Sequence, residues 1–91
     1  DITAVLKKKV TKEEINAAMT KASKGELKNI LFVTEEELVS SDFIGSPASA
    51  TVDLALTNVV DGTLVKVVAW YDNEWGYANR LVEMAQLVGK K

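Results

Sequence analysis

The spacing of hydrophobic and polar residues predicts a strand followed by a helix in the first quarter of the chain. Residues 2–6 form a short β-rich run that ends at three lysines. Thr11 and Glu14 have the spacing of a capping box, so a helix over residues 12–24 should begin there. Its apolar positions recur with helical spacing at Ile15, Ala18, Met19 and Ala22. Gly25 is then expected to end the helix by adopting a left-handed backbone conformation, so the pattern as a whole predicts an amphipathic helix.

The middle of the chain predicts mostly strands. Residues 30–33 are a short apolar run, and Thr34 should cap a single helical turn over residues 34–38. Two longer β-rich runs, 51–60 and 63–71, flank Asp61-Gly62, which is a strong hairpin signal, so they should pair antiparallel. Both faces of the second run are mostly apolar. We therefore expect other elements to cover both faces of this strand, with Lys66 near a margin of the covered surface.

The last segment, roughly residues 74–88, predicts a second helix, with Asn73 or Asp72 placed as its N-cap. Its apolar stripe consists of Tyr77, Leu81, Met84, Ala85 and Val88. The order of elements predicts an α+β fold, with a mixed, partly antiparallel sheet and two helices, the second being a long C-terminal helix.

Composition limits the chemistry that this chain can perform. Its 91 residues suffice for one domain or part of one, and a compact fold would expose about 5,000 Å². The chain has no cysteine and no histidine, which excludes disulfides and a complete Ser-His-Asp or Cys-His centre. Three consecutive glutamates, 35–37, cannot share one helical face. We therefore expect no catalytic residue and no metal site in this chain.

Charge and hydropathy indicate which partners to expect. The net charge is −2, and ten of the eleven cationic residues are lysines. Lysine lacks the planar group with which arginine makes paired hydrogen bonds to phosphates and bases, so the composition does not favour nucleic-acid binding. No stretch approaches the roughly 20 apolar residues of a membrane span. We expect neither a nucleic acid nor a membrane as partner. The chain opens at Asp1 within a strand-like pattern, which suggests a piece of a longer protein.

Residues 70–77, Trp-Tyr-Asp-Asn-Glu-Trp-Gly-Tyr, hold four of the six aromatic residues. A strand that leads directly into a helix places its junction at a sheet edge, where the helix N–H groups face outward. The short amide of Asn73 would there suit a planar polar group such as a carboxamide. The same pattern is typical of a structural role, in which Asn73 caps the helix and Trp70, Trp75 and Tyr77 fill a core. The residues alone leave both interpretations open.

This octapeptide, with Ala-Asn-Arg after it at 78–80, closely resembles the C-terminal signature of the glyceraldehyde-3-phosphate dehydrogenase family. The resemblance continues upstream through residues 65–68, 41–45 and 1–3, so it covers essentially the whole chain. It implies that residues 1–91 are the C-terminal portion of the catalytic domain. The dinucleotide-binding domain and the segment with the nucleophile would then lie outside these residues.

The resemblance also implies an activity and a cofactor. The family oxidises and phosphorylates glyceraldehyde 3-phosphate, passing a hydride to a nicotinamide cofactor, NAD or NADP, through a cysteine thioester that phosphate cleaves. Asn73 matches the asparagine that binds the nicotinamide carboxamide, whereas Tyr77, and less directly Tyr71, match tyrosines that line that end of the pocket. Trp70 and Trp75 are interpreted as packing residues. Substrate and phosphate would bind through other segments, so this chain alone would be inactive.

By the same resemblance, the complete protein is expected to be a cytoplasmic homotetramer in which the final helix docks against the dinucleotide domain. In isolation, the apolar stripe of that helix and one sheet face should be exposed. Two alternatives remain open from the residues. One is erythrose-4-phosphate dehydrogenase, which usually carries Cys and Phe where Tyr71 and Tyr77 stand. The other is a non-enzymatic interaction module.

Overall fold

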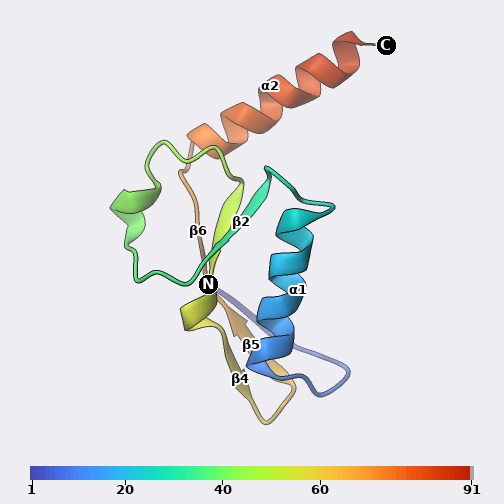
Figure 1. Ribbon diagram of the computed structural model, residues 1–91, viewed down its shortest axis with the longest axis vertical. Helices are drawn as coiled ribbons and strands as arrows, with labels where there is room; N and C mark the ends of the chain where they lie inside the picture. Colours follow the sequence, from blue (N-terminus) through green and yellow to red (C-terminus); the bar gives the residue numbers. More distant parts are fainter. Residues whose placement is uncertain (91) are drawn as a thin grey trace.

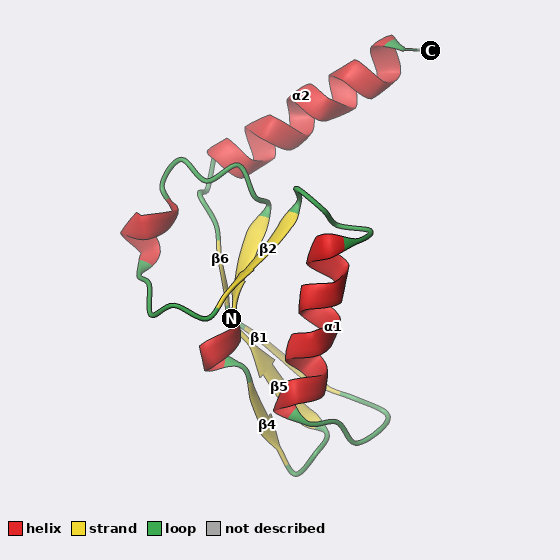
Figure 2. Cartoon of the chain, viewed as in Figure 1, coloured by secondary structure: helices red, strands yellow, loops and turns green. Residues whose placement is uncertain are grey.

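The strands form two small sheets with one helix against them and a second helix that projects away (Figures 1 and 2). The computed structural model describes residues 1–90, with the side chain of Ser40 left out. The helices are α1 (Lys12–Lys24) and α2 (Trp75–Gly89). One sheet has the order β1 (Ile2–Val5), β5 (Leu64–Val67), β4 (Asn58–Val60). The other has the order β2 (Leu31–Thr34), β3 (Ala50–Asp53), β6 (Ala69–Trp70).

The predicted α+β class is confirmed. In the first sheet both pairs are antiparallel, whereas β2 runs parallel to β3 and β3 antiparallel to β6. The mixed character arises from the connection between β2 and β3, which crosses over through the 3₁₀ turn η1 (Ser40–Phe43). Helix α1 contacts β2 and lies beside the second sheet (Figure 1). Ile15, Met19 and Ala22 of its apolar stripe are half-buried, whereas Ala18 is exposed.

The two long β-rich runs pair antiparallel as predicted, but each is split between the two sheets. Thr51 lies opposite Trp70 in β3 and β6, whereas Asn58 lies opposite Lys66 in β4 and β5. The 3₁₀ turn η2 (Leu54–Leu56) inserts 3 residues between the pairs, which accounts for the change of register. At the hairpin tip Asp61 and Gly62 both have positive φ, 53° and 77°, as the Asp-Gly signal requires.

The N-terminal end of α1 matches the sequence expectation, whereas the turn expected at residues 34–38 is wrong. Gly25 does end the helix as its C-cap residue, but its φ is −112°, so the expected left-handed conformation is wrong. The Glu14 N–H donates to the Thr11 hydroxyl, and the Thr11 N–H donates to the Glu14 carboxylate, each at 3.2 Å. Thr34 stays paired in β2 instead of starting a helix, although its hydroxyl accepts the Glu36 N–H. The helical turn forms later, at η1, because the Asp42 carboxylate accepts the Val39 N–H at 2.8 Å.

The hydrophobic core is small, and the molecule is elongated. Its buried apolar side chains are Phe43, Ala48, Val52, Leu54 and Val65. The accessible surface is 6694 Å², well above the compact value of about 5,000 Å². The Cα radius of gyration is 14.8 Å, against about 12 Å for a compact domain of this length. The difference arises because α2 extends beyond the sheets and one sheet face lies open (Figure 1).

The outer face of the β1–β5–β4 sheet is exposed, so the expectation of cover on both sides is wrong for this chain. Val65 on the inner face is 3% exposed, whereas its neighbour Leu64 is 38% exposed. Val5 and Val60 lie opposite Leu64 on the two adjacent strands and are also exposed, which makes an apolar row across the sheet. On this same face the Lys66 ammonium lies 3.1 Å from the Asp1 carboxylate. The expected position of Lys66 near a margin is wrong, because β5 is the central strand of the sheet.

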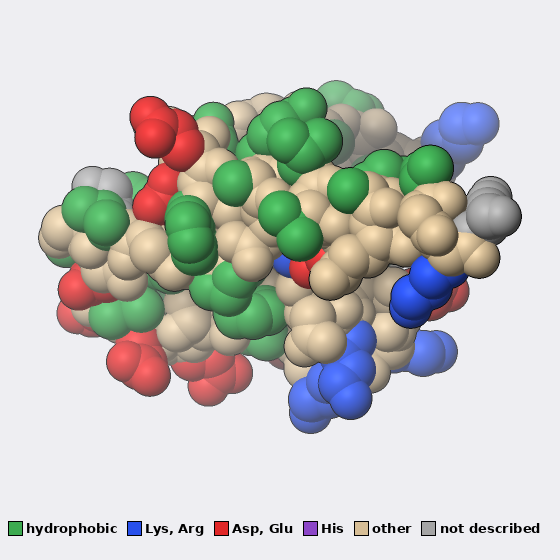
Figure 3. Space-filling model, turned by 90° about the horizontal axis from the view of Figure 1, so that it is seen from above, with side chains coloured by type: hydrophobic (Ala, Val, Ile, Leu, Met, Phe, Trp, Pro, Cys, Tyr) green, Lys and Arg blue, Asp and Glu red, His purple; other side chains and the backbone are tan. Residues whose placement is uncertain are grey.

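Helix α2 also exposes apolar residues, as the sequence predicts for this chain in isolation. The exposed residues on its last three turns include Leu81, Val82, Met84, Leu87 and Val88. Figure 3, seen from the α2 side, shows hydrophobic side chains spread over this face between acidic groups on the left and basic groups on the right. Among residues 1–90, no helix has the length and apolar content that a membrane crossing requires.

The first turns of α2 hold the helix to the rest of the chain. Gly76 is buried, and a Cβ at this position would overlap the Ala48 carbonyl oxygen and lie 3.2 Å from its carbon. One turn further, the Arg80 guanidinium donates to the Ser49 hydroxyl at 3.0 Å. The close backbone approach at Gly76 thus sets where α2 starts relative to residues 48–49.

Gly76→Ala should therefore lower the free energy of unfolding by about 1–3 kcal/mol, because the backbone of Ala48 must move to admit the methyl group. Urea unfolding followed by circular dichroism measures this change. Gly89→Ala is the matched control, since a Cβ there meets no atom within 4 Å. Equal stability of Gly76→Ala and the parent would show that the contact is not a constraint.

Candidate functional site

The junction between β6 and α2 is built around the carboxylate of Asp72. Its Oδ1 accepts the N–H groups of Glu74 and Trp75, each at 3.0 Å, so Asp72 satisfies the first free donors of the helix. Its Oδ2 accepts the Gly45 N–H at 2.8 Å, which ties the junction to the loop after η1. The N-cap residue of α2 is Glu74, so the prediction of Asp72 or Asn73 at that position is wrong, although the Asp72 side chain makes the capping bonds from two residues earlier.

These three bonds also set the ionisation of Asp72. The pKa of its carboxyl group lies below the ordinary value, chiefly because the Gly45 N–H stabilises the charged form, with the Trp75 and Glu74 N–H groups adding to it. A lowered pKa in the folded state means that the bonds stabilise the fold above the ordinary carboxyl pKa. This stabilisation is lost as the pH falls through the lowered value. At neutral pH the junction therefore carries a fixed negative charge.

Asn73 follows the capping residue and lies between two hollows. One, of about 420 Å³, is lined by Ser41, Ile44, Tyr71, Asp72, Asn73 and Glu74. The other, of about 290 Å³, is lined by Ser49, Tyr71, Asp72, Asn73, Tyr77 and Arg80. Asn73 is exposed, and its carboxamide has no hydrogen-bond partner within the described part of the chain. The structure thus brings Asn73, Tyr71 and Tyr77 to one place and leaves the amide free.

The two tryptophans of the octapeptide differ in their surroundings. The ring of Trp70 stacks on Phe43 with centroids 5.8 Å apart and planes at 5°, and its Nε1 donates to buried Asp53 at 3.3 Å. The expectation that Trp70 packs is confirmed. The same expectation for Trp75 is wrong, because its side chain is 52% exposed. Trp75 lies at the start of α2, and about half of its surface remains open in this chain.

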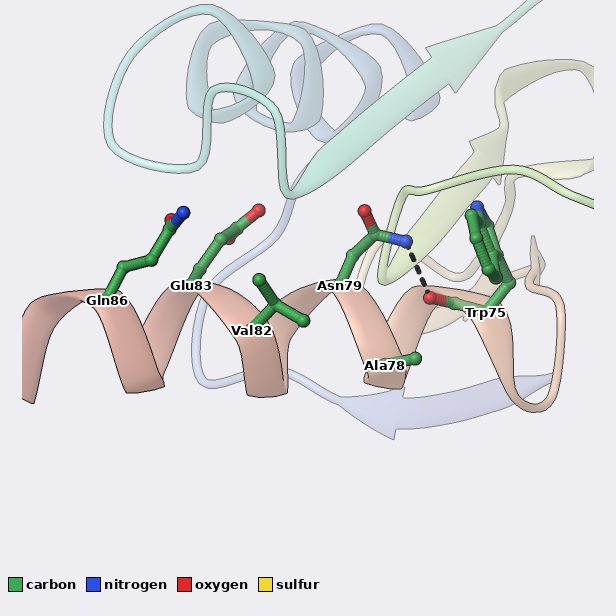
Figure 4. A pocket seen from close by; sticks show the side chains of 6 residues that line it. All are labelled: Trp75, Ala78, Asn79, Val82, Glu83 and Gln86. Atoms are coloured by element: carbon green, nitrogen blue, oxygen red, sulfur yellow. Dashed lines mark hydrogen bonds between the residues drawn. The ribbon is translucent and has the colours of Figure 1, made fainter.

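Trp75 instead lines a third hollow of about 330 Å³ along α2, together with Ala78, Asn79, Val82, Glu83 and Gln86. Figure 4 shows these side chains along the helix, with the Asn79 amide bonded to the Trp75 carbonyl at 2.8 Å. Arg80 holds Glu83 in a two-pronged contact at 2.8 and 2.9 Å, which lowers the pKa of the Glu83 carboxyl group. The amide of Asn79 is thus engaged within the helix, unlike that of Asn73.

The arrangement at Asn73 is suited to binding and orientation rather than to bond breaking. A free carboxamide offers one acceptor and two donors beside two exposed tyrosine rings. Residues 1–90 bring together no group of three side chains that could hold a metal ion. Sequence reasoning missed the Asp72–Gly45 and Arg80–Ser49 bonds, because they join positions 27 and 31 residues apart. The only nearby sequence feature that pointed to this region was the pair Gly45 and Pro47, which predicts a loop there.

Comparison with known proteins defines the family. The profile of the family "Glyceraldehyde 3-phosphate dehydrogenase, C-terminal domain" matches residues 1–73. The chain is 53% identical over 91 residues to glyceraldehyde-3-phosphate dehydrogenase of Geobacillus stearothermophilus, and 53% identical over 92 residues to that of Streptomyces coelicolor. It is 52% identical over 91 residues to the cytosolic enzyme of Chlamydomonas reinhardtii. Each match covers 100% of this chain and 27% of the relative.

The fold and the comparisons together define an α+β segment that is similar to the C-terminal domain of a dehydrogenase family. The chain belongs to the glyceraldehyde-3-phosphate dehydrogenase family, as the octapeptide at residues 70–77 indicates. It spans about a quarter of the length of these curated relatives.

Proposed function

We propose that this chain is the C-terminal portion of a phosphorylating glyceraldehyde-3-phosphate dehydrogenase catalytic domain, and that it positions the nicotinamide of the cofactor. The observation that carries the proposal is the free amide of Asn73 between two hollows. Asp72 makes the capping bonds, so Asn73 is not needed to cap the helix. The nicotinamide ring would supply the hydride acceptor, and this segment would hold that ring in place.

The carboxamide of Asn73 is chemically matched to the carboxamide of a nicotinamide. Each group carries one acceptor oxygen and an NH₂ donor, so the two can bond and fix which ring face meets the substrate. The backbone of Asn73 is held on both sides, by the stacked Trp70 and by the capped start of α2. A short side chain on a held backbone loses less conformational freedom on binding than a long one, which favours precise orientation.

Tyr77 and Tyr71 would form the aromatic wall of the same pocket. Their side chains are 72% and 61% exposed, and both line the smaller hollow with Asn73. Neither hydroxyl has a hydrogen-bond partner within the described residues, so a proton-transfer role has no geometric support. The rings would exclude water and restrict the movement of the nicotinamide.

The remaining parts of the activity belong to the rest of the enzyme. Because the chain has no cysteine and no histidine, it would be inactive alone, with the nucleophile and base supplied by preceding segments. We infer a cytoplasmic homotetramer that uses NAD, or NADP, with glyceraldehyde 3-phosphate and phosphate as substrates. The apolar row at Val5, Leu64 and Val60 and the exposed stripe of α2 support burial against other parts of that assembly.

Asn73→Ala in the complete dehydrogenase that carries this chain should weaken cofactor binding by about two- to tenfold, the value of one hydrogen bond. Hydride transfer should also slow, because the ring loses its orientation. The melting temperature should stay within a few degrees of the parent, since Asp72 provides the cap. Cofactor titration, single-turnover kinetics and thermal unfolding measure the three quantities.

The matched control is Asn79→Ala, which removes the same chemical group from α2, six residues further along the chain and beside another hollow. Its cofactor affinity should equal that of the parent. Unchanged kinetics in Asn73→Ala, accompanied by a lower melting temperature, would assign Asn73 a structural role and overturn the proposal.

Substitutions of Tyr77 distinguish two roles for this residue, an aromatic ring that lines the cofactor pocket and a hydroxyl that donates a proton. Tyr77→Phe keeps the ring, so the cofactor KM and kcat should remain within about twofold of the parent. Tyr77→Ala removes the ring and should weaken cofactor binding by about two- to tenfold. A loss of kcat in Tyr77→Phe as large as in Tyr77→Ala would show that the hydroxyl, not the ring, is the functional group.

A further inference from the structure

The Asp72 carboxylate is the one side chain in the described structure that bonds both to the start of α2 and to the loop after η1. Oδ1 accepts two N–H groups of the helix start, and Oδ2 accepts the Gly45 N–H at 2.8 Å. Gly45 has a φ of +83°, a conformation that side chains rarely adopt, and a Cβ there would meet nothing within 4 Å. The glycine is therefore required by the backbone direction that aims its N–H at Asp72.

We propose that Asp72 is a positioning residue that acts through Asn73, by fixing the direction in which the Asn73 amide leaves the junction. This inference rests on the proposed cofactor role of Asn73. Ser41 in η1 and Ile44 after it line the larger hollow together with Tyr71 and Asn73 of the junction. The Asp72–Gly45 bond joins these two segments, so it holds them together beside Asn73.

Two observations separate this role from simple capping. The two oxygens have different partners, so the cap and the loop bond are chemically distinct functions of one side chain. The loop is also attached by a second contact, the stacking of Phe43 on Trp70. Loss of the Gly45 bond should therefore leave the loop folded while the junction gains freedom. Bonds to an ionised acceptor are about twice as strong as neutral ones, which suits a carboxylate for this role.

The test uses Asp72→Asn in the complete dehydrogenase. Asparagine keeps an oxygen that can cap the helix, but it places an NH₂ donor opposite the Gly45 N–H, so only the loop bond is lost. We expect cofactor affinity to fall about two- to tenfold, with the KM for phosphate unchanged and a melting temperature within a few degrees of the parent. Should this variant not fold, Asp72→Ser also retains a capping oxygen and loses the second one.

The decisive measurement is a double-mutant cycle with Asn73→Ala. If Asp72 acts through Asn73, Asp72→Asn has little further effect on cofactor affinity once Asn73 is alanine. Additive effects, or an Asp72→Asn variant with parental affinity, would overturn the positioning role and leave the role of Asn73 intact. An Asn73→Ala variant with parental affinity would instead overturn the cofactor role of Asn73, and the inference with it.

Discussion

The close approach between Gly76 and the Ala48 carbonyl is the constraint on which the functional end of this chain depends. Residues 71–74 separate β6 from α2, so α2 could take many directions, and the backbone contact at Gly76 restricts them. Only glycine permits that approach, because any Cβ would overlap the oxygen. The direction of α2 in turn places Asn73 and Tyr77 on the same side of the junction, where they line one hollow.

The elements governed by local chemistry could be predicted from the sequence. The capping box at Thr11 and Glu14 and the Asp61-Gly62 turn depend on residues at most three apart. The break of the long β run at η2 could not be predicted, because residues 54–56 continue its apolar pattern. That break transfers the chain from one sheet to the other. It reflects tertiary packing, with Leu54 buried in the core.

In the candidate site, too, some features could be predicted from local sequence and others depended on tertiary structure. The octapeptide predicted that Tyr71, Asn73 and Tyr77 would share one site, and in the structure all three line one hollow. Coordinates were required to show that the Asp72 side chain, and not that of Asn73, makes the capping bonds, because both residue types favour that role. Trp75 was misplaced because a helical pattern cannot tell a face that packs within the chain from one that remains open. Large apolar residues at 75 and 81–88 mark surface that the described elements do not cover.

We propose that the Asn73 amide faces the redox ring of a bound coenzyme. A crystal structure of the complete dehydrogenase with its nicotinamide cofactor bound would test this placement. The Asn73 carboxamide should lie within hydrogen-bond distance of the nicotinamide carboxamide, with the Tyr77 ring beside it and Asp72 still capping α2. An Asn73 side chain turned back onto the helix start, with the nicotinamide held by other residues, would contradict it.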